Sequence, residues 1–170
     1  LRIARSAPTA RVVSIEFSAA NAGVAQRIWE HAGVADRITC VVGTLGDGGA
    51  TLDTLATEHG FSPGCLDLLF IDHDKRAYLS DLLSVLDRRW LHPGSIVVAD
   101  NVRVPGAPKY RAYMRDLQGT LFNALERGER PGADGGGPGV RLSPDDFEVF
   151  RTEQMTRSAT VLLVDMSRSM

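Results

Sequence analysis

The sequence has few cysteines, little net charge and no long apolar run. Its 170 residues include two cysteines, Cys40 and Cys65, which lack C-x-x-C or metal-ligand spacing and are interpreted as small core residues in a reducing compartment. A formal net charge of −2 gives no electrostatic reason to expect nucleic acid as a partner. No run approaches the roughly 18 apolar residues of a membrane span, and a signal peptide is not recognised. We expect one cytoplasmic globular domain, residues 1–170, of unknown oligomeric state.

Short apolar runs alternate with helical patterns along most of the chain. The run "RVVSIEF" (11–17) precedes helical spacing of apolar residues over 20–32. The same alternation recurs as "DRITCVVG" before 49–59, "CLDLLFID" before 75–89 and "GSIVVADN" before 108–117. Near-continuous apolar strands that alternate with helices are typical of a parallel sheet with both faces covered. The sequence therefore predicts a mostly parallel α/β sheet.

The two ends of the chain give further expectations. The opening "LRIARSA" resembles the tail of a helix without a start signal, so the beginning of the domain is expected to be missing. Residues 126–144 are rich in Gly and Pro and are expected to form a flexible surface loop. The last runs, "DFEVFRTE" and "ATVLLVDM", are predicted as an antiparallel strand pair joined near 155–158.

Polar residues follow the predicted strands where a parallel sheet binds ligands, outside the carboxyl ends of its strands. Glu16 closes the first strand, and its carboxylate has two acceptor oxygens that match the two hydroxyls of a ribose. A plain helix-capping acid remains the alternative. The turn "GTLGD" follows the second strand in the same way.

Asp72, Asp100 and Asn101 form a second group at the ends of two successive strands. All three bear oxygen, which suits a hard cation such as Mg²⁺. The alternative is that each aspartate only caps the helix after it. Asp-Asn in tandem before a Pro-containing loop is not explained by capping, so the set favours a metal site.

Lys75 and His73 lie in the same stretch, "DHDK". A partly desolvated lysine beside a cation can have its pKa lowered enough to act as a general base. An exposed first-turn lysine is the alternative, although a cation at a helix start is mildly unfavourable. His73 is interpreted either as a ligand contact or as an ordinary loop residue.

Four stretches together carry a family resemblance: "VVSIEFS", "HAGVADRITCVVG", "LDLLFIDHDKRAYLSDLL" and "LHPGSIVVADNVRVPGAP". From about residue 1 to 116 the chain resembles the catechol O-methyltransferase family of class I S-adenosylmethionine-dependent enzymes, with a vaguer match at 147–165. The resemblance implies a Rossmann-like class I methyltransferase fold. It also implies S-adenosylmethionine as cosubstrate, Mg²⁺ as cofactor and a catechol-like small molecule as substrate.

The resemblance also implies a function for individual residues. The cofactor-binding positions it implies are Glu16, Thr44, Leu45, Gly46, Asp72 and His73. The implied metal ligands are Asp72, Asp100 and Asn101, and the implied general base is Lys75. The substrate would meet Lys75, Asn101, Pro105 and Glu153, with Glu148 as the alternative to Glu153. The implied reaction is an in-line attack of a catechol oxygen on the sulfonium methyl group.

The chain departs from the family pattern in four places. Asp74 stands where the animal enzymes have an aromatic residue, and Leu45 and Gly46 replace polar residues near the adenine. The glycine-rich loop after the family's first strand has no counterpart, because the glycines of 132–139 follow no predicted strand. That first strand, expected between the strands ending at Glu16 and Asp72, is therefore predicted to be missing, which would leave two unpaired interior edges.

Three functions remain open from the sequence. The first is the magnesium-assisted O-methyltransferase. The second is a non-catalytic or truncated methyltransferase-fold domain that has lost part of the cofactor site. The third, a nicotinamide-dependent oxidoreductase, depends on Glu16 alone and is disfavoured because no G-x-G-x-x-G precedes it.

Overall fold

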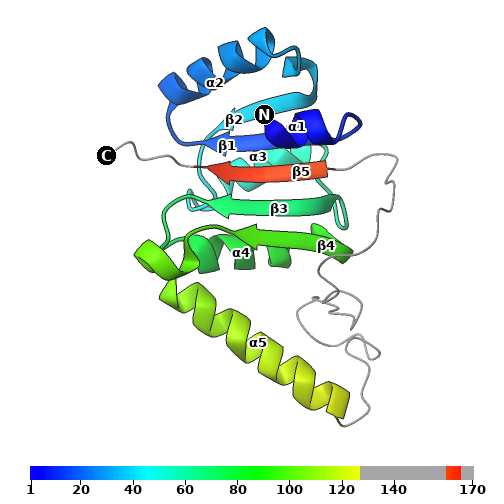
Figure 1. The fold of residues 1–170 in the computed structure, drawn as a ribbon, viewed down its shortest axis with the longest axis vertical. Coiled ribbons are helices and arrows are strands. Elements are labelled where there is room, and N and C mark those ends of the chain that lie inside the picture. The colour runs from blue at the N-terminus through cyan, green and yellow to red at the C-terminus, as the bar shows by residue number, and fades with distance from the viewer. Residues whose placement is uncertain (127–159, 166–170) are drawn as a thin grey trace.

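A computed structural model describes residues 1–126 and 160–165 of the chain. Its centre is a five-stranded sheet (Figure 1). The strands are β1 (Arg11–Glu16), β2 (Ile38–Val42), β3 (Leu66–Asp72), β4 (Leu91–Ala99) and β5 (Thr160–Asp165). The first four confirm the strands expected from the sequence.

Helices connect the strands in the expected order. They are α1 (Arg2–Ser6), α2 (Ala19–His31), α3 (Ala50–His59), α4 (Tyr78–Asp87) and α5 (Pro108–Glu126), with the helical turns η1 (Ala35–Arg37) and η2 (Val102–Gly106). Ser18 caps α2 by accepting a hydrogen bond from the Asn21 amide, and Gly60 ends α3 in a left-handed conformation that glycine adopts without strain. None of the described helices has the length and apolar character needed to span a lipid bilayer.

The strand order is β2-β1-β5-β3-β4, and every pairing is parallel. The prediction of an antiparallel C-terminal strand is therefore wrong for β5, and its predicted partner, 146–153, lies outside the described residues. The physical reason is the composition of β5: four consecutive apolar residues, 161–164, suit an interior position of a parallel sheet better than an edge. The Gly/Pro-rich segment 127–144 also lies outside the described residues.

β5 fills the position between β1 and β3 that the sequence suggested would be empty (Figure 1). Its residues pair with β1 from Arg11 to Ile15 and with β3 from Leu68 to Asp72. Both interior edges therefore have backbone hydrogen-bonding partners, as buried peptide groups require. The expectation of two unpaired interior edges is wrong.

The two faces of the sheet are covered by different helices. Val13 and Ile15 face the larger apolar cluster, which is completed by residues of α3, α4 and α5. Val12, on the opposite face, belongs to a smaller cluster that includes Ala4 of α1 and Trp29 of α2. Because successive strand residues point to opposite faces, the apolar run of β1 places core residues on both sides. This packing fixes the carboxyl ends of the strands, where the candidate site lies.

Candidate functional site

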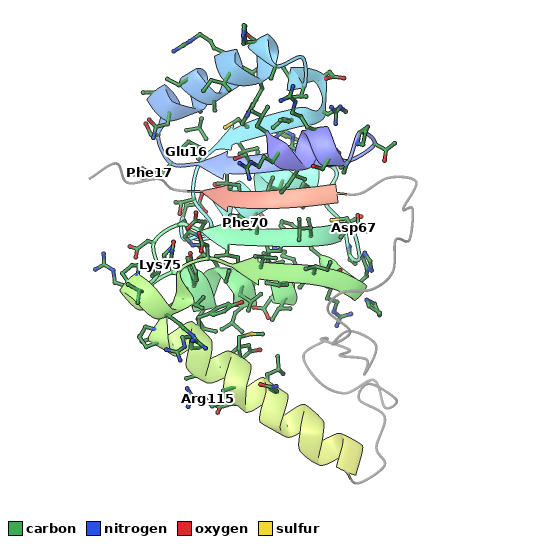
Figure 2. The ribbon with its side chains drawn as sticks, in the orientation of Figure 1. Glu16, Phe17, Asp67, Phe70, Lys75 and Arg115 are labelled. Atoms are coloured by element: carbon green, nitrogen blue, oxygen red, sulfur yellow. The ribbon has the colours of Figure 1, made fainter. Side chains whose placement is uncertain are left out.

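The candidate residues lie at one edge of the sheet. β1 ends at Glu16, β3 at Asp72, and β4 is followed directly by Asp100. Figure 2 shows Glu16 and Lys75 at this end, with Asp67 at the other. The strands are parallel and Ile71 is paired with Ala99, so the residues after them are neighbours, and the Asp100 amide donates to the Ile71 carbonyl at 3.0 Å. The structure thus brings the ends of β3 and β4 together as expected.

Lys75 is held between two oxygen atoms from different elements. Its Nζ donates to Asp72 Oδ1 at 2.9 Å and to the Tyr78 hydroxyl at 2.5 Å. The Tyr78 hydroxyl in turn donates to the backbone carbonyl of Asp100 at 3.0 Å. The Lys75 side chain is 17% exposed, so it is neither a freely solvated lysine nor a fully buried one. The alternative of an exposed first-turn lysine is wrong.

The surroundings of Lys75 raise its pKa above the ordinary value. Burial alone would lower the pKa, but the hydrogen bonds and charges of Tyr78 and Asp72 outweigh it. A lysine that acts as a general base is expected to have a lowered pKa, so this shift is in the opposite direction. Lys75 would therefore have to give up a proton that Asp72 and Tyr78 stabilise. Burial raises the pKa of Tyr78, which keeps its phenol in the protonated, hydrogen-bond-donating form.

The three candidate metal ligands share the chemistry of a hard-cation site. Asp72 is about one-third exposed, and Asp100 and Asn101 lie at the surface. Asn101 adopts a left-handed conformation at φ 52°, which asparagine tolerates better than most residues. Its backbone N–H donates a hydrogen bond to Asp100 Oδ1. The described residues contain no cluster of three or more His, Cys, Asp or Glu that would hold a metal. Two carboxylates and one amide oxygen nevertheless fit a cation that retains several water ligands.

Glu16 is buried at the end of β1, with 8% of its surface exposed. Its Oε1 accepts a hydrogen bond from the Ser18 amide at 2.8 Å, which fixes the carboxylate just before α2. The cap of α2 is Ser18, so Glu16 lies close to the start of the helix without capping it. Burial and then the charge of Glu16 raise the pKa of the Cys40 thiol on β2, a half-buried residue that packs against the smaller apolar cluster.

The turn after β2 is hydrogen-bonded to the start of α3. The Thr44 amide donates to Thr51 Oγ1 at 3.2 Å, and the Gly46 amide donates to Thr44 Oγ1 at 3.3 Å. Leu45, in contrast, is 4% exposed and packs in the larger core cluster. The turn thus places Thr44 and Gly46 near the surface, whereas the Leu45 side chain faces the interior.

His73 is turned into the protein. Its Nε2 lies 2.7 Å from Asp81 Oδ2, and both side chains are buried. The His73 ring also lies against the Tyr78 ring, with a centroid distance of 5.1 Å. Neither Asp81 nor Tyr78 was predicted as a site residue from the sequence. The sequence does contain a signal for both residues. Tyr78 and Asp81 follow Lys75 by three and six positions and lie on the buried side of α4, which is otherwise apolar.

The remaining candidates are scattered. Asp74 forms an ion pair with Arg76 at 3.3 Å, so its charge is partly offset. Pro105 is an exposed residue of η2, the helical turn that begins directly after Asn101. Glu148 and Glu153 lie outside the described residues.

Several known proteins are similar to this chain. Residues 1–110 match a family model described as O-methyltransferase. A probable O-methyltransferase of Mycobacterium tuberculosis is 71% identical over 74% of this chain and 54% of its own length. The catechol O-methyltransferase of Sus scrofa is 38% identical over 64% of this chain and 55% of its own. A catechol O-methyltransferase of M. tuberculosis is 36% identical over 78% of this chain and 56% of its own. The chain spans about half the length of these relatives. It belongs to the O-methyltransferase family.

Proposed function

We propose that the protein transfers a methyl group from S-adenosylmethionine to a hydroxyl of a catechol-like small molecule, with magnesium as cofactor and Lys75 as general base. The observation that carries the proposal is the position of Lys75. Its Nζ is held by Asp72 and Tyr78 beside the strand end that bears Asp100 and Asn101. Membership of the family supports methyl transfer, and the names of the porcine and mycobacterial relatives support a catechol as acceptor.

Glu16 is the residue proposed to hold the ribose hydroxyls of S-adenosylmethionine. One carboxylate oxygen is already oriented by the Ser18 amide, so the group does not need to be ordered on binding. Thr44 and Gly46 are proposed to lie at the adenine, where the turn after β2 reaches the surface. Leu45 and His73 have side chains buried in protein contacts, so we propose that they act by shaping the backbone.

Asp72, Asp100 and Asn101 are proposed to hold Mg²⁺, because they combine two carboxylates with an amide at adjacent strand ends. Bound there, the cation would supply electrostatic stabilisation of the negative charge on the acceptor oxygen. Asp72 would then serve both the cation and Lys75. Its partial exposure leaves room for both contacts.

In the proposed reaction, Lys75 first loses its own proton to solvent, and the neutral amine then accepts the proton of the acceptor hydroxyl. The oxygen forms a bond to the methyl carbon while the carbon–sulfur bond breaks, and the bonding electron pair stays on sulfur. The products are the methyl ether and S-adenosylhomocysteine. The protein contributes mainly by aligning the reacting atoms and by placing charge near the acceptor.

An isotope-transfer assay tests this function. The protein is incubated with methyl-labelled S-adenosylmethionine and either catechol or resorcinol, whose two hydroxyls are too far apart to share one cation. We expect label in catechol only, loss of transfer with EDTA and recovery with Mg²⁺. Absence of transfer to any catechol would contradict the proposal, and equal labelling of resorcinol would contradict the magnesium-chelation part of it.

A second candidate is a non-catalytic domain of the same fold. The observation that favours it is that β5 occupies the interior position beside β1, and the described residues place no glycine-rich turn next to Glu16. Calorimetry with S-adenosylmethionine, S-adenosylhomocysteine and NAD separates the candidates. Binding of the first two ligands supports the enzyme, and binding of none supports the non-catalytic domain.

A further inference from the structure

Tyr78, the first residue of α4, connects three parts of the candidate site. Its side chain is fully buried, and its hydroxyl lies between Lys75 Nζ and the carbonyl oxygen of Asp100. Lys75 follows β3, whereas Asp100 follows β4. The hydroxyl therefore joins the candidate base to the strand end that bears two of the candidate metal ligands.

The direction of these hydrogen bonds is fixed by the chemistry of the phenol. A tyrosine hydroxyl has one hydrogen, and here it is donated to the Asp100 carbonyl, which only accepts. Towards Lys75 the hydroxyl can therefore only accept. The second partner of Lys75, the Asp72 carboxylate, also accepts. Lys75 thus has two acceptors at fixed places, each of which takes one N–H.

The position of the hydroxyl is fixed by the packing of the ring. The Tyr78 ring meets Tyr110 of α5 edge to face at a centroid distance of 5.9 Å and lies 5.1 Å from the His73 ring. His73 Nε2 in turn lies 2.7 Å from Asp81 Oδ2, and both side chains are buried. Because a buried aromatic ring with neighbours on two sides cannot swing, its hydroxyl is a rigid anchor rather than an adaptable one.

We propose that Tyr78 is a positioning residue for Lys75: its hydroxyl holds Nζ at the carboxyl end of β4, next to Asp100 and Asn101. This inference rests on the proposed function of Lys75. A neutral lysine amine has two N–H groups and one lone pair. If Asp72 and Tyr78 take the two N–H groups, the lone pair is directed away from both, towards the acceptor hydroxyl.

The first test compares Tyr78→Phe with Tyr110→Phe. Both variants remove one hydroxyl from a buried tyrosine and keep the ring, and the described contacts of Tyr110 include no hydrogen bond to Lys75. Circular dichroism and thermal melting first establish that both variants are folded. We expect Tyr78→Phe to lower kcat roughly 3- to 10-fold with KM for the acceptor unchanged, as loss of one positioning hydrogen bond predicts. Tyr110→Phe should keep the parental kcat.

The second test does not depend on activity. The chain has two lysines, Lys75 and the exposed Lys109, so Lys109 is an internal reference for amine labelling. The protein is treated with a trace of acetic anhydride, and acetylation of each lysine is measured by peptide mass spectrometry. In the parent Lys75 should react more slowly than Lys109. In Tyr78→Phe, but not in Tyr110→Phe, the Lys75/Lys109 ratio should rise several-fold.

The two tests separate the possible failures. A parental labelling ratio in Tyr78→Phe overturns the inference whatever the activity, because it shows that the hydroxyl does not hold Lys75. A raised ratio with parental kcat also overturns it, because the contact then has no effect on the reaction. If the parent shows no methyl transfer, the proposed function fails, and the labelling ratio alone decides whether Tyr78 positions Lys75.

Discussion

His73 Nε2 lies 2.7 Å from Asp81 Oδ2, and the two buried side chains join the end of β3 to helix α4. The segment between them contains Lys75 and Tyr78. An aspartate inside an otherwise apolar helix face is thus explained by a histidine eight residues earlier. The two residues flank the segment that bears the candidate base.

Asp81→Ala should destabilise the protein by about 1–3 kcal/mol, because it leaves the buried His73 ring without its partner. Urea unfolding of parent and variant measures the difference. Asp87→Ala is the matched control, since Asp87 is an exposed acid at the end of the same helix. Equal stability of Asp81→Ala and Asp87→Ala would show that the buried pair contributes nothing.

Gly43→Ala should also destabilise, by about 1–3 kcal/mol, because its new Cβ would overlap Thr51 Oγ1. Thr51 cannot easily move away, since its hydroxyl also accepts from the Thr44 amide and donates to Asp47. Gly46→Ala is the control, as a Cβ there meets nothing closer than 3.9 Å.

A double-mutant cycle isolates the overlap at Gly43. Thr51→Ala removes the overlapping hydroxyl, so Gly43→Ala should cost less stability in that background than in the parent. Strictly additive effects in urea unfolding would exclude the overlap as the cause.

Asp47 should make stability depend on pH in acid. Burial alone would raise its pKa, but hydrogen bonds from the Thr51 side chain and from the amides of Thr51, Gly49 and Ala50 outweigh it and lower the pKa below the ordinary 3.8. A carboxylate with a lowered pKa in the folded state stabilises the fold above its unfolded pKa, and this contribution is lost as pH falls through the folded pKa.

Asp47→Asn tests this dependence. The parent should be more stable than the variant at pH 6, and the difference should shrink as pH falls below about 3.8. Urea unfolding at a series of pH values measures it. A difference that stays constant from pH 6 into strong acid would rule out the charge of Asp47 as its source.

The alternation of strands and helices could be predicted because each element carries its own periodicity. The positions of Glu16, Asp72 and Asp100 followed, since strand ends coincide with changes from apolar to polar residues. The contact between Lys75 and Asp72 is also local, being three residues apart.

Contacts that depend on distant segments could not be predicted in the same way. The position of β5 depends on the edges that β1 and β3 leave open, although its four consecutive apolar residues already argued against an edge. His73 faces inward because α4 presents Asp81 to it, and Leu45 faces inward because the turn after β2 packs on the core. Neither direction is encoded in a short motif.

Removal of the candidate metal ligand Asp100 should weaken Mg²⁺ binding. Asp100→Asn replaces a charged oxygen with a neutral one, so the affinity for Mg²⁺ should fall by roughly tenfold or more. Because Asp100 is exposed, the fold should keep its stability. Isothermal calorimetry with Mg²⁺ measures the affinity, and Asp116→Asn, an exposed acid on α5, is the control. Parental affinity in Asp100→Asn would remove it from the metal site.

The role of Lys75 as general base is tested most directly by kcat for methyl transfer to catechol in Lys75→Met. Lys109→Met, the substitution of the chain's other lysine, is the control. We predict that Lys75→Met lowers kcat by about 10² or more while the calorimetric Kd for S-adenosylmethionine stays at the parental value, because loss of a general base acts on the transition state. Lys109→Met should behave as the parent. A parental kcat in Lys75→Met would contradict the assignment of Lys75 as the base.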